Sequence, residues 1–298
     1  MEITEQRSAV YKAIDTWRDA DILDALVGGQ ERAIAAVRAA IPQISRAADA
    51  LVSNLRCGGK LYYAGAGTSI RIGVQDGSEL PATFGMAEEK IGYLVAGGRA
   101  AMFETLANAE DDAEEGVRVA SVLSPIDTLV AIAASGATPF TVAAAKSAKQ
   151  KGATVIAVVN NTASQLAATA DFEIFLNSGP EVLAGSTRMG AGTAQKAALN
   201  LLSTLAHIKL GAVYDGMMVN VRADNLKLKK RAHGIVAAIS GAGDEQATSA
   251  LEAANGNVKL AILICAGAKS VQSAQQQLVD TDGNLRVALE RERSKTES

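Results

Sequence analysis

The chain has few of the residues on which several kinds of active site depend. Its 298 residues include only two cysteines, Cys57 and Cys265, and two histidines, His207 and His233. The cysteines lie far apart without the paired spacing of a metal site, so we expect reduced thiols and no disulfide framework. His207 lies in an apolar helical stretch, where a structural role is the commoner one. We therefore expect no hydrolytic triad, no metal centre and no cofactor.

Long apolar runs and an excess of positive charge are lacking as well. Charged residues make up 20% of the chain with a formal net charge of -3, and this dispersed balance argues against nucleic acid or an anionic membrane as the main partner. No apolar run is long enough to cross a bilayer, and no basic-then-apolar leader follows Met1. The sequence therefore predicts a cytoplasmic protein.

The composition that is present favours α/β layers. Hydrophobic residues make up 48% of the chain but aromatic residues only 4%, and Ala, Gly and Val are abundant. Five short apolar runs predict strands at Leu61–Ala64, Ile91–Ala96, Thr128–Ala133, Thr154–Asn160 and Phe172–Leu176. Because helical patterns alternate with them at spacings of roughly thirty residues or less, we expect a doubly wound parallel sheet of about five strands.

The pattern changes on both sides of this sheet. An amphipathic stripe between Ile22 and Leu55 predicts a helix that Pro42 breaks or kinks. Beyond about Val221 the pattern is of short helices punctuated by glycine. We therefore expect an N-terminal arm and helix over 1–56, the sheet domain over 57–220, and a small helical domain over 221–298.

The first predicted strand runs into a glycine-rich turn and a helix. Gly65 and Gly67 allow unusual φ angles, and Thr68 and Ser69 lie where helix N-caps are favoured. Backbone N–H groups and the helix dipole attract phosphate there without a lysine. A dinucleotide site is not favoured, because Ile70 stands where the third glycine of that fingerprint belongs. A sugar phosphate suits this hydroxyl-rich turn better.

Two further hydroxyl-bearing loops follow later strands. Ser135, Gly136 and Thr138 come after the third strand, with Pro139 suited to a first helical turn, and Ser186 and Thr187 precede a long helix. Because ligands bind at the carboxyl ends of strands in a doubly wound sheet, the three loops are expected to converge on a ligand. The alternative is that each hydroxyl only caps its own helix.

Carboxylates are the remaining candidates for catalysis. Pro81 disfavours helical geometry at Leu80, so we expect the first helix to end there and Glu79 to lie in or just after its last turn. Near the negative pole of a helix an ionised carboxylate is disfavoured, which suits a general acid. Glu110 leads an acidic run whose alternative interpretation is a solvated helix face.

These motifs together resemble one family. Between about Thr4 and Asn225 the chain resembles the N-acetylmuramic acid 6-phosphate etherases. The segments that carry the resemblance are, in order, AGAGTS, RIGVQDGSELPATFG, AGG with NAEDDAEEG, AASGATPF and GSTRMGAGTAQKAALN. Those enzymes have the sugar isomerase (SIS) fold and are related to the glucokinase regulatory protein. The resemblance implies a SIS sheet that dimerises, a small C-terminal helical domain, and a 3-O-lactyl amino-sugar phosphate as substrate. It also implies a role in amino sugar catabolism and peptidoglycan recycling.

The resemblance also implies which residues form the substrate site and which reaction they catalyse. The three hydroxyl-bearing loops correspond to the family's sugar-phosphate site. Their residues at that site are Gly67, Thr68, Ser69, Ser135, Gly136, Thr138, Ser186 and Thr187. The family's catalytic glutamates fall on Glu79, in SELPAT, and Glu110, in AEDD. The expected activity is that of a carbon–oxygen lyase that eliminates D-lactate and adds water, with Glu79 as acid and Glu110 as base or the reverse. The alternatives are a non-catalytic sugar-phosphate sensor and an aldose–ketose isomerase.

The sequence departs from the family pattern at a few positions. Ile70 replaces a usual glycine, Leu80 and Ala82 replace a usual Cys and Pro, and the N-terminal TEQR lacks its usual Asn-Pro sequel. Ile70 adds a branched side chain beside the phosphate loop, where it narrows the pocket or packs on a neighbouring helix.

Overall fold

The computed structural model describes residues 2–104, 106–223 and 225–296. They fall into two compact units, one of Met1–Ser78 with Glu89–Leu205 and the other of Glu79–Glu88 with Ala206–Ser298. The three-part organisation expected from the sequence stays a prediction, because compactness alone does not define an independently folding domain.

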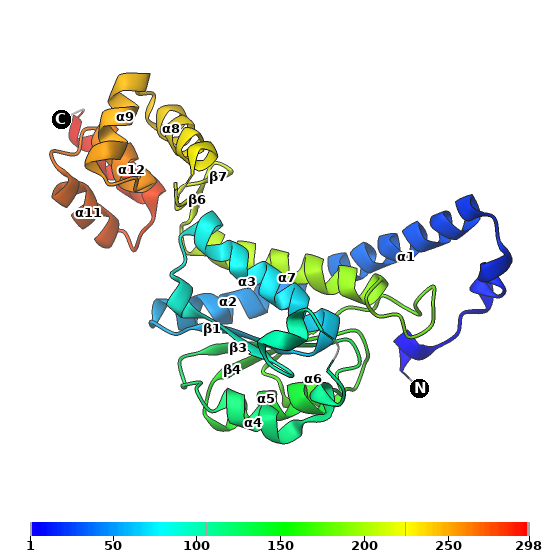
Figure 1. Cartoon of the computed structure of the whole chain (residues 1–298). Coiled ribbons are helices and arrows are strands. Elements are labelled where there is room, and N and C mark those ends of the chain that lie inside the picture. Colours follow the sequence, from blue (N-terminus) through cyan, green and yellow to red (C-terminus); the bar gives the residue numbers. More distant parts are fainter. Residues whose placement is uncertain (1, 105, 224, 297–298) are drawn as a thin grey trace. The chain divides into compact units, whose positions relative to one another are not determined.

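The first unit is built on a five-stranded parallel sheet (Figure 1). Its strands are β1 (Leu61–Gly65), β2 (Ile91–Val95), β3 (Thr128–Ala133), β4 (Thr154–Val159) and β5 (Phe172–Phe175). They lie in the order β2-β1-β3-β4-β5, so the chain moves from β1 outward to the edge strand β2 and then returns to place β3 on the other side of β1. The predicted sheet is confirmed, and its topological switch lies between the carboxyl ends of β1 and β3.

Helices cover both faces of this sheet. The helices of the first unit, in chain order, are α1 (Asp19–Ala39), α2 (Ile41–Arg56), α3 (Gly67–Phe84), α4 (Ala113–Ala120), α5 (Pro139–Gln150), α6 (Gln165–Thr169) and α7 (Gly190–Lys209), of which α3 and α7 continue into the second unit. Side chains of α4, α5 and α6 share one buried apolar cluster with the strands, whereas α2, α3 and α7 lie on the opposite face (Figure 1). Burial on both faces explains why β1 and β3 appear in the sequence as continuous apolar runs.

A buried aspartate joins two helices of the second face to the sheet. Asp76 of α3 is 4% exposed and accepts hydrogen bonds from Tyr63 Oη (2.7 Å), Asn200 Nδ2 (2.6 Å) and Ser203 Oγ (3.0 Å). Burial and the neighbouring Asp76 charge raise the pKa of Tyr63 well above its usual value. Strand β1, α3 and α7 are thereby fixed beneath the loops at the sheet edge.

Two prolines behave differently from each other. Pro42 separates α1 from α2 and lies in the first turn of α2, so the predicted break is confirmed. Pro81 was expected to end α3, but the helix runs on to Phe84 with Pro81 inside it. A proline this close to the helix end removes only one intrahelical hydrogen bond, which the remaining helix tolerates. Glu79 therefore lies five residues before the helix ends rather than in its last turn.

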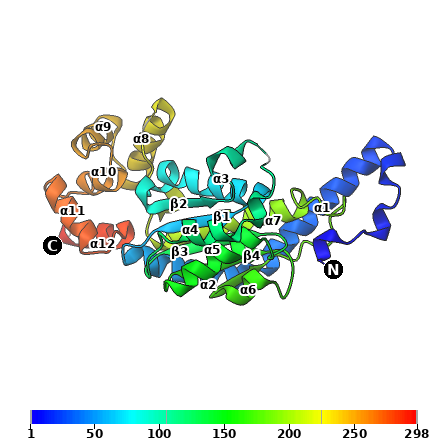
Figure 2. The same cartoon turned by 60° about the horizontal axis from the view of Figure 1, so that its bottom comes forward.

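The second unit is helical, as expected (Figure 2). Its helices are α8 (Leu226–Ser240), α9 (Asp244–Ala253), α10 (Val258–Cys265), α11 (Val271–Val279) and α12 (Leu285–Thr296), preceded by a short hairpin of β6 (Val213–Tyr214) and β7 (Met217–Met218). Apolar side chains of the hairpin and helices share one core. No helix in the described ranges is long and apolar enough to cross a membrane.

Lys259 lies in this helical core and provides the first testable prediction. Its side chain is 7% exposed and donates to the Gly283 carbonyl (2.8 Å), and burial lowers its pKa to about 8. Below pH 8 the folded state must bury an ammonium ion. Between pH 8 and the unfolded pKa the unfolded chain binds more protons, so stability rises with pH.

We expect Lys259→Met to raise the free energy of unfolding by about 2–3 kcal/mol at pH 7, because no charge is then buried. The gain should shrink towards pH 10, where native Lys259 is already neutral. Chemical denaturation of both proteins at the two pH values measures this. A difference that stays constant with pH would show that Lys259 is not the titrating group.

Candidate active site

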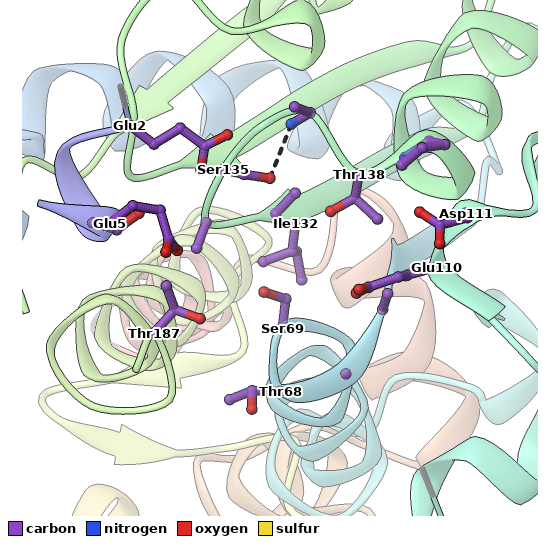
Figure 3. A pocket seen from close by; sticks show the side chains of 17 residues that line it. Glu2, Glu5, Thr68, Ser69, Glu110, Asp111, Ile132, Ser135, Thr138 and Thr187 are labelled. Atoms are coloured by element: carbon purple, nitrogen blue, oxygen red, sulfur yellow. Dashed lines mark hydrogen bonds between the residues drawn. The ribbon is translucent and has the colours of Figure 1, made fainter. Parts of the chain in front are cut away.

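A polar hollow of about 420 Å³ opens at the switch point between β1 and β3 (Figure 3). Three connections contribute to it, namely the β1–α3 turn, the β3–α5 loop and the loop that precedes α7. The N-terminal segment and the short helix η6 (Ala109–Asp111) complete its wall. Ligands of doubly wound sheets bind at this edge.

The β1–α3 turn places two hydroxyls beside the hollow. Gly65 has to be a glycine, because a Cβ there would lie 2.8 Å from the Ile132 carbonyl oxygen. Helix α3 begins at Gly67, so Thr68 and Ser69 lie in its first turn rather than at the N-cap. All three residues from Gly67 to Ser69 line the hollow.

A chain of hydrogen bonds fixes the orientation of the Ser69 hydroxyl. Ser69 Oγ donates to Gln195 Oε1 (3.0 Å), and Gln195 Nε2 donates to Asn160 Oδ1 (3.0 Å). Asn160 Nδ2 in turn donates to the Leu176 carbonyl (3.0 Å). Because that carbonyl can only accept, the direction of the whole chain is set, and the lone pairs of Ser69 Oγ are left for the hollow.

The β3–α5 loop adds the second pair of hydroxyls. Ser135 Oγ accepts the Ala137 N–H (3.1 Å), so its own proton is available to a ligand (Figure 3). Thr138 is the N-cap of α5, as predicted, but its side chain makes no capping hydrogen bond and lines the hollow instead. Gly136 does not line it; with φ +67° and Ser164 Oγ 2.3 Å from where a Cβ would lie, Gly136 permits the fold of the loop.

The third loop differs from expectation. Thr187 lines the hollow but Ser186 does not. The first amides of α7 are already occupied, because Gly190 N–H and Ala191 N–H donate to the buried Glu181 carboxylate (2.9 and 2.8 Å). Sequence reasoning missed Glu181, since an acid nine residues before a helix carries no capping signal.

Glu181 is the basis of the second prediction. Glu181→Ala leaves two buried N–H groups at the start of α7 without an acceptor, so we expect the free energy of unfolding to fall by about 2–3 kcal/mol. Glu181→Gln keeps one acceptor oxygen, so its free energy of unfolding should fall by less. Urea denaturation of both variants measures the difference, and equal stability of Glu181→Ala and the unmodified chain would contradict the capping role.

The acidic residues between Glu110 and Glu115, which follow β2, have different structural surroundings. Glu110 and Asp111 line the hollow from η6, whereas Asp112 caps α4 by accepting the Glu115 N–H (2.9 Å). Glu115 is paired with Arg118, whose hydrogen bond lowers the pKa of that carboxyl. Only the start of the run therefore faces the candidate site.

The other predicted catalytic residue, Glu79, belongs to the second unit. It is exposed on α3 and is not among the residues that line the hollow, whereas Glu110 is. Ser69 and Glu79 are ten positions apart in one helix, which corresponds to about 15 Å along its axis.

Ile70, the departure beside the phosphate turn, does not enter the hollow. It is 1% exposed and its Cβ lies 3.4 Å from where a Cβ of Gly65 would be, so it packs beneath the turn. The branched side chain therefore contributes to the core and leaves the candidate site open.

Comparisons with known proteins agree on the family. The SIS domain profile matches residues 101–205, and that of the glucokinase regulatory protein N-terminal SIS domain matches residues 43–149. N-acetylmuramic acid 6-phosphate etherase from Deinococcus radiodurans is 41% identical, over 96% of this chain and 94% of the relative. The protein of that name from Streptomyces avermitilis is 45% identical over 89% of this chain and 86% of the relative.

One more relative and one solved structure are also similar to this chain. N-acetylmuramic acid 6-phosphate etherase 1 from Vibrio cholerae is 42% identical over 97% of each chain. A phosphoheptose isomerase from Francisella tularensis has a TM-score of 0.49 at 22% identity, covering 64% of this chain and 98% of that one. The chain belongs to the N-acetylmuramic acid 6-phosphate etherase family.

Proposed function

We propose that this chain cleaves the D-lactyl ether of N-acetylmuramic acid 6-phosphate to give N-acetylglucosamine 6-phosphate and D-lactate. The observation that carries the proposal is that Glu110 and the hydroxyls of three loops face one hollow at the switch point of the sheet. Relatives that match along nearly the whole chain are named etherases, which does not favour a sensor or an isomerase.

The reaction needs a base and an acid. In the open-chain sugar the C1 aldehyde acidifies the C2 hydrogen, so a carboxylate can remove that proton. The electron pair then forms the C2–C3 double bond while the C3–O bond breaks, and lactate leaves with a proton from an acid. Water adds at C3 and a proton returns to C2. We assign Glu110 as the C2 base and Glu79 as the acid that later activates water.

The hydroxyl loops are proposed to hold the sugar phosphate. Ser135 and Thr138 offer free hydroxyl donors at the start of α5, where the helix dipole favours an anion. Thr68, Ser69 and Thr187 face the same hollow. Ser186 and Gly136 act on the shape of their loops, since neither lines it.

We also propose that the chain is cytoplasmic and works as a homodimer. A hexose 6-phosphate is shorter than the distance along α3 that separates Ser69 from Glu79. In a dimer, Glu79 of the second copy can approach the substrate in the hollow of the first copy, because the two residues then do not share one helix. Shared sites of this kind occur in symmetric dimers.

The activity is tested by incubating the protein with N-acetylmuramic acid 6-phosphate in water enriched in heavy oxygen. Elimination and hydration predict lactate without label and a sugar phosphate labelled at C3. Label in the lactate hydroxyl instead, or binding without lactate release, would contradict the proposal.

A further inference from the structure

The hollow is strongly acidic for a site that binds a phosphate. Four carboxyl groups line it, those of Glu2, Glu5, Glu110 and Asp111, and none of its described lining residues is Lys, Arg or His. Each carboxylate repels a phosphate dianion. Glu110 has a proposed catalytic role, but phosphate binding does not explain the acids of the N-terminal segment.

The N-terminal segment that carries Glu5 is fixed in place. Thr4 is 1% exposed, and the Asn161 side chain accepts the Ile3 N–H (2.6 Å) and donates to Thr4 Oγ1 (3.1 Å) and to the Ala134 carbonyl (2.9 Å). The Thr4 carbonyl accepts the Gly185 N–H (3.0 Å). Backbone on the N-terminal side of Glu5 is therefore held to the loops after β3, β4 and β5.

The loop beside Glu5 leaves room for its carboxylate. Gly185 has φ +76°, which disfavours any residue with a Cβ, and a Cβ there would lie 2.8 Å from Glu5 Oε2 and displace the carboxylate from its present position. The backbone beside Glu5 is thus held, while its carboxylate is exposed and makes no hydrogen bond or ion pair with any described residue.

Figure 3 places Glu5 and Glu110 on opposite sides of the hollow with Ser69 between them. Ser69 also presents lone pairs to this space, because its proton is directed to Gln195. This part of the hollow therefore presents three acceptor groups, namely the carboxylates of Glu5 and Glu110 and the lone pairs of Ser69 Oγ. The groups that match it are donors, which a sugar supplies as hydroxyls and an acetamido group as N–H.

We propose that Glu5 is a specificity-determining residue that accepts hydrogen bonds from the hydroxyl or amide N–H groups of the bound amino sugar. This inference rests on the proposed function for the class of ligand. The phosphate then lies on the donor side of the hollow, at Ser135 and Thr138. The carboxylate contributes to the affinity for the sugar part of the ligand and opposes binding of phosphate alone.

Glu5→Gln separates these two effects, because it keeps the size of the side chain and removes its charge. We expect the KM for N-acetylmuramic acid 6-phosphate to rise about tenfold, as for the loss of a charge-assisted hydrogen bond. Inhibition by inorganic phosphate should stay equal or become tighter, since one repulsive charge is removed. A merely structural role would weaken both ligands together.

Two further variants control the experiment. Asn161→Ala frees the N-terminal segment and should also raise the KM for the sugar phosphate. Asp15→Asn removes a charge from the same N-terminal arm, but Asp15 lies outside the hollow. The KM for the sugar phosphate and the inhibition constant for inorganic phosphate should therefore both stay unchanged. An unchanged KM in Glu5→Gln, or parallel weakening of sugar phosphate and inorganic phosphate, would overturn the role of Glu5.

Calorimetry keeps this test separate from the proposed reaction. If the unmodified chain released no lactate, the proposed function would fail. The affinities of the unmodified chain and Glu5→Gln for N-acetylglucosamine 6-phosphate and for inorganic phosphate would still test the inference. Selective weakening of the sugar phosphate supports it, and weakening of neither or of both contradicts it.

Discussion

Glu110→Gln is expected to lower lactate release by roughly 10²–10⁴-fold, the usual contribution of a positioned general base or acid. Glutamine has the size of glutamate but cannot take up the C2 proton. Because Glu110 faces the hollow from η6 and its side chain makes no hydrogen bond or ion pair with the residues that the structure describes, folding and binding should be preserved. The kcat for lactate release and the calorimetric affinity for N-acetylglucosamine 6-phosphate measure the two effects separately.

Asp111→Asn is the matched control for this variant. Asp111 is the next residue in the chain and also lines the hollow, so its replacement changes the local charge equally. We expect it to retain kcat within a few-fold. Lactate release by Glu110→Gln at the rate of the unmodified chain would refute the assignment of Glu110.

Deuterium exchange at C2 distinguishes base from acid. If Glu110 is the base, Glu110→Gln should lose both lactate release and exchange of the C2 hydrogen with heavy water. Glu79→Gln should then retain exchange while losing lactate release, because proton removal does not need the acid. The opposite result would reverse the two roles.

The sheet was predictable because it is a local property of the sequence. Each strand is a short buried run, so Thr128–Ala133 was expected and found with the same bounds. The other runs that follow β1 end one residue earlier than expected, as with β4 at Val159. Strand order and the convergence of loops then follow from the general handedness and topology of parallel sheets.

Features that depend on distant residues were not predictable in the same way. Asn161 and Thr4 form a hydrogen bond although they are 157 positions apart, and no sequence pattern around either residue indicates its partner. Glu181 reaches the start of α7 from an irregular segment, where periodicity carries no information. The position of Pro81 inside α3 shows that a local breaker signal is overridden when the surrounding helix is held by other contacts.

A mixture of two inactive variants is expected to regain activity. If each site combines Glu110 of one copy with Glu79 of the other, a dimer of Glu79→Gln with Glu110→Gln has one intact site and one site with both changes. Random pairing from an equal mixture makes half of all dimers mixed, so about a quarter of the unmodified activity should return. Dimers purified through two different affinity tags should show about half.

The same experiment decides whether Glu79 acts within its own chain. In that case every site in a mixed dimer lacks one glutamate, and lactate release stays at the level of each variant alone. Pairs of Glu79→Gln carrying the two tags control for effects of the tags and should stay inactive. Recovery would explain why Glu79 is exposed and outside the hollow of its own chain, because its working position would then be the hollow of the second copy.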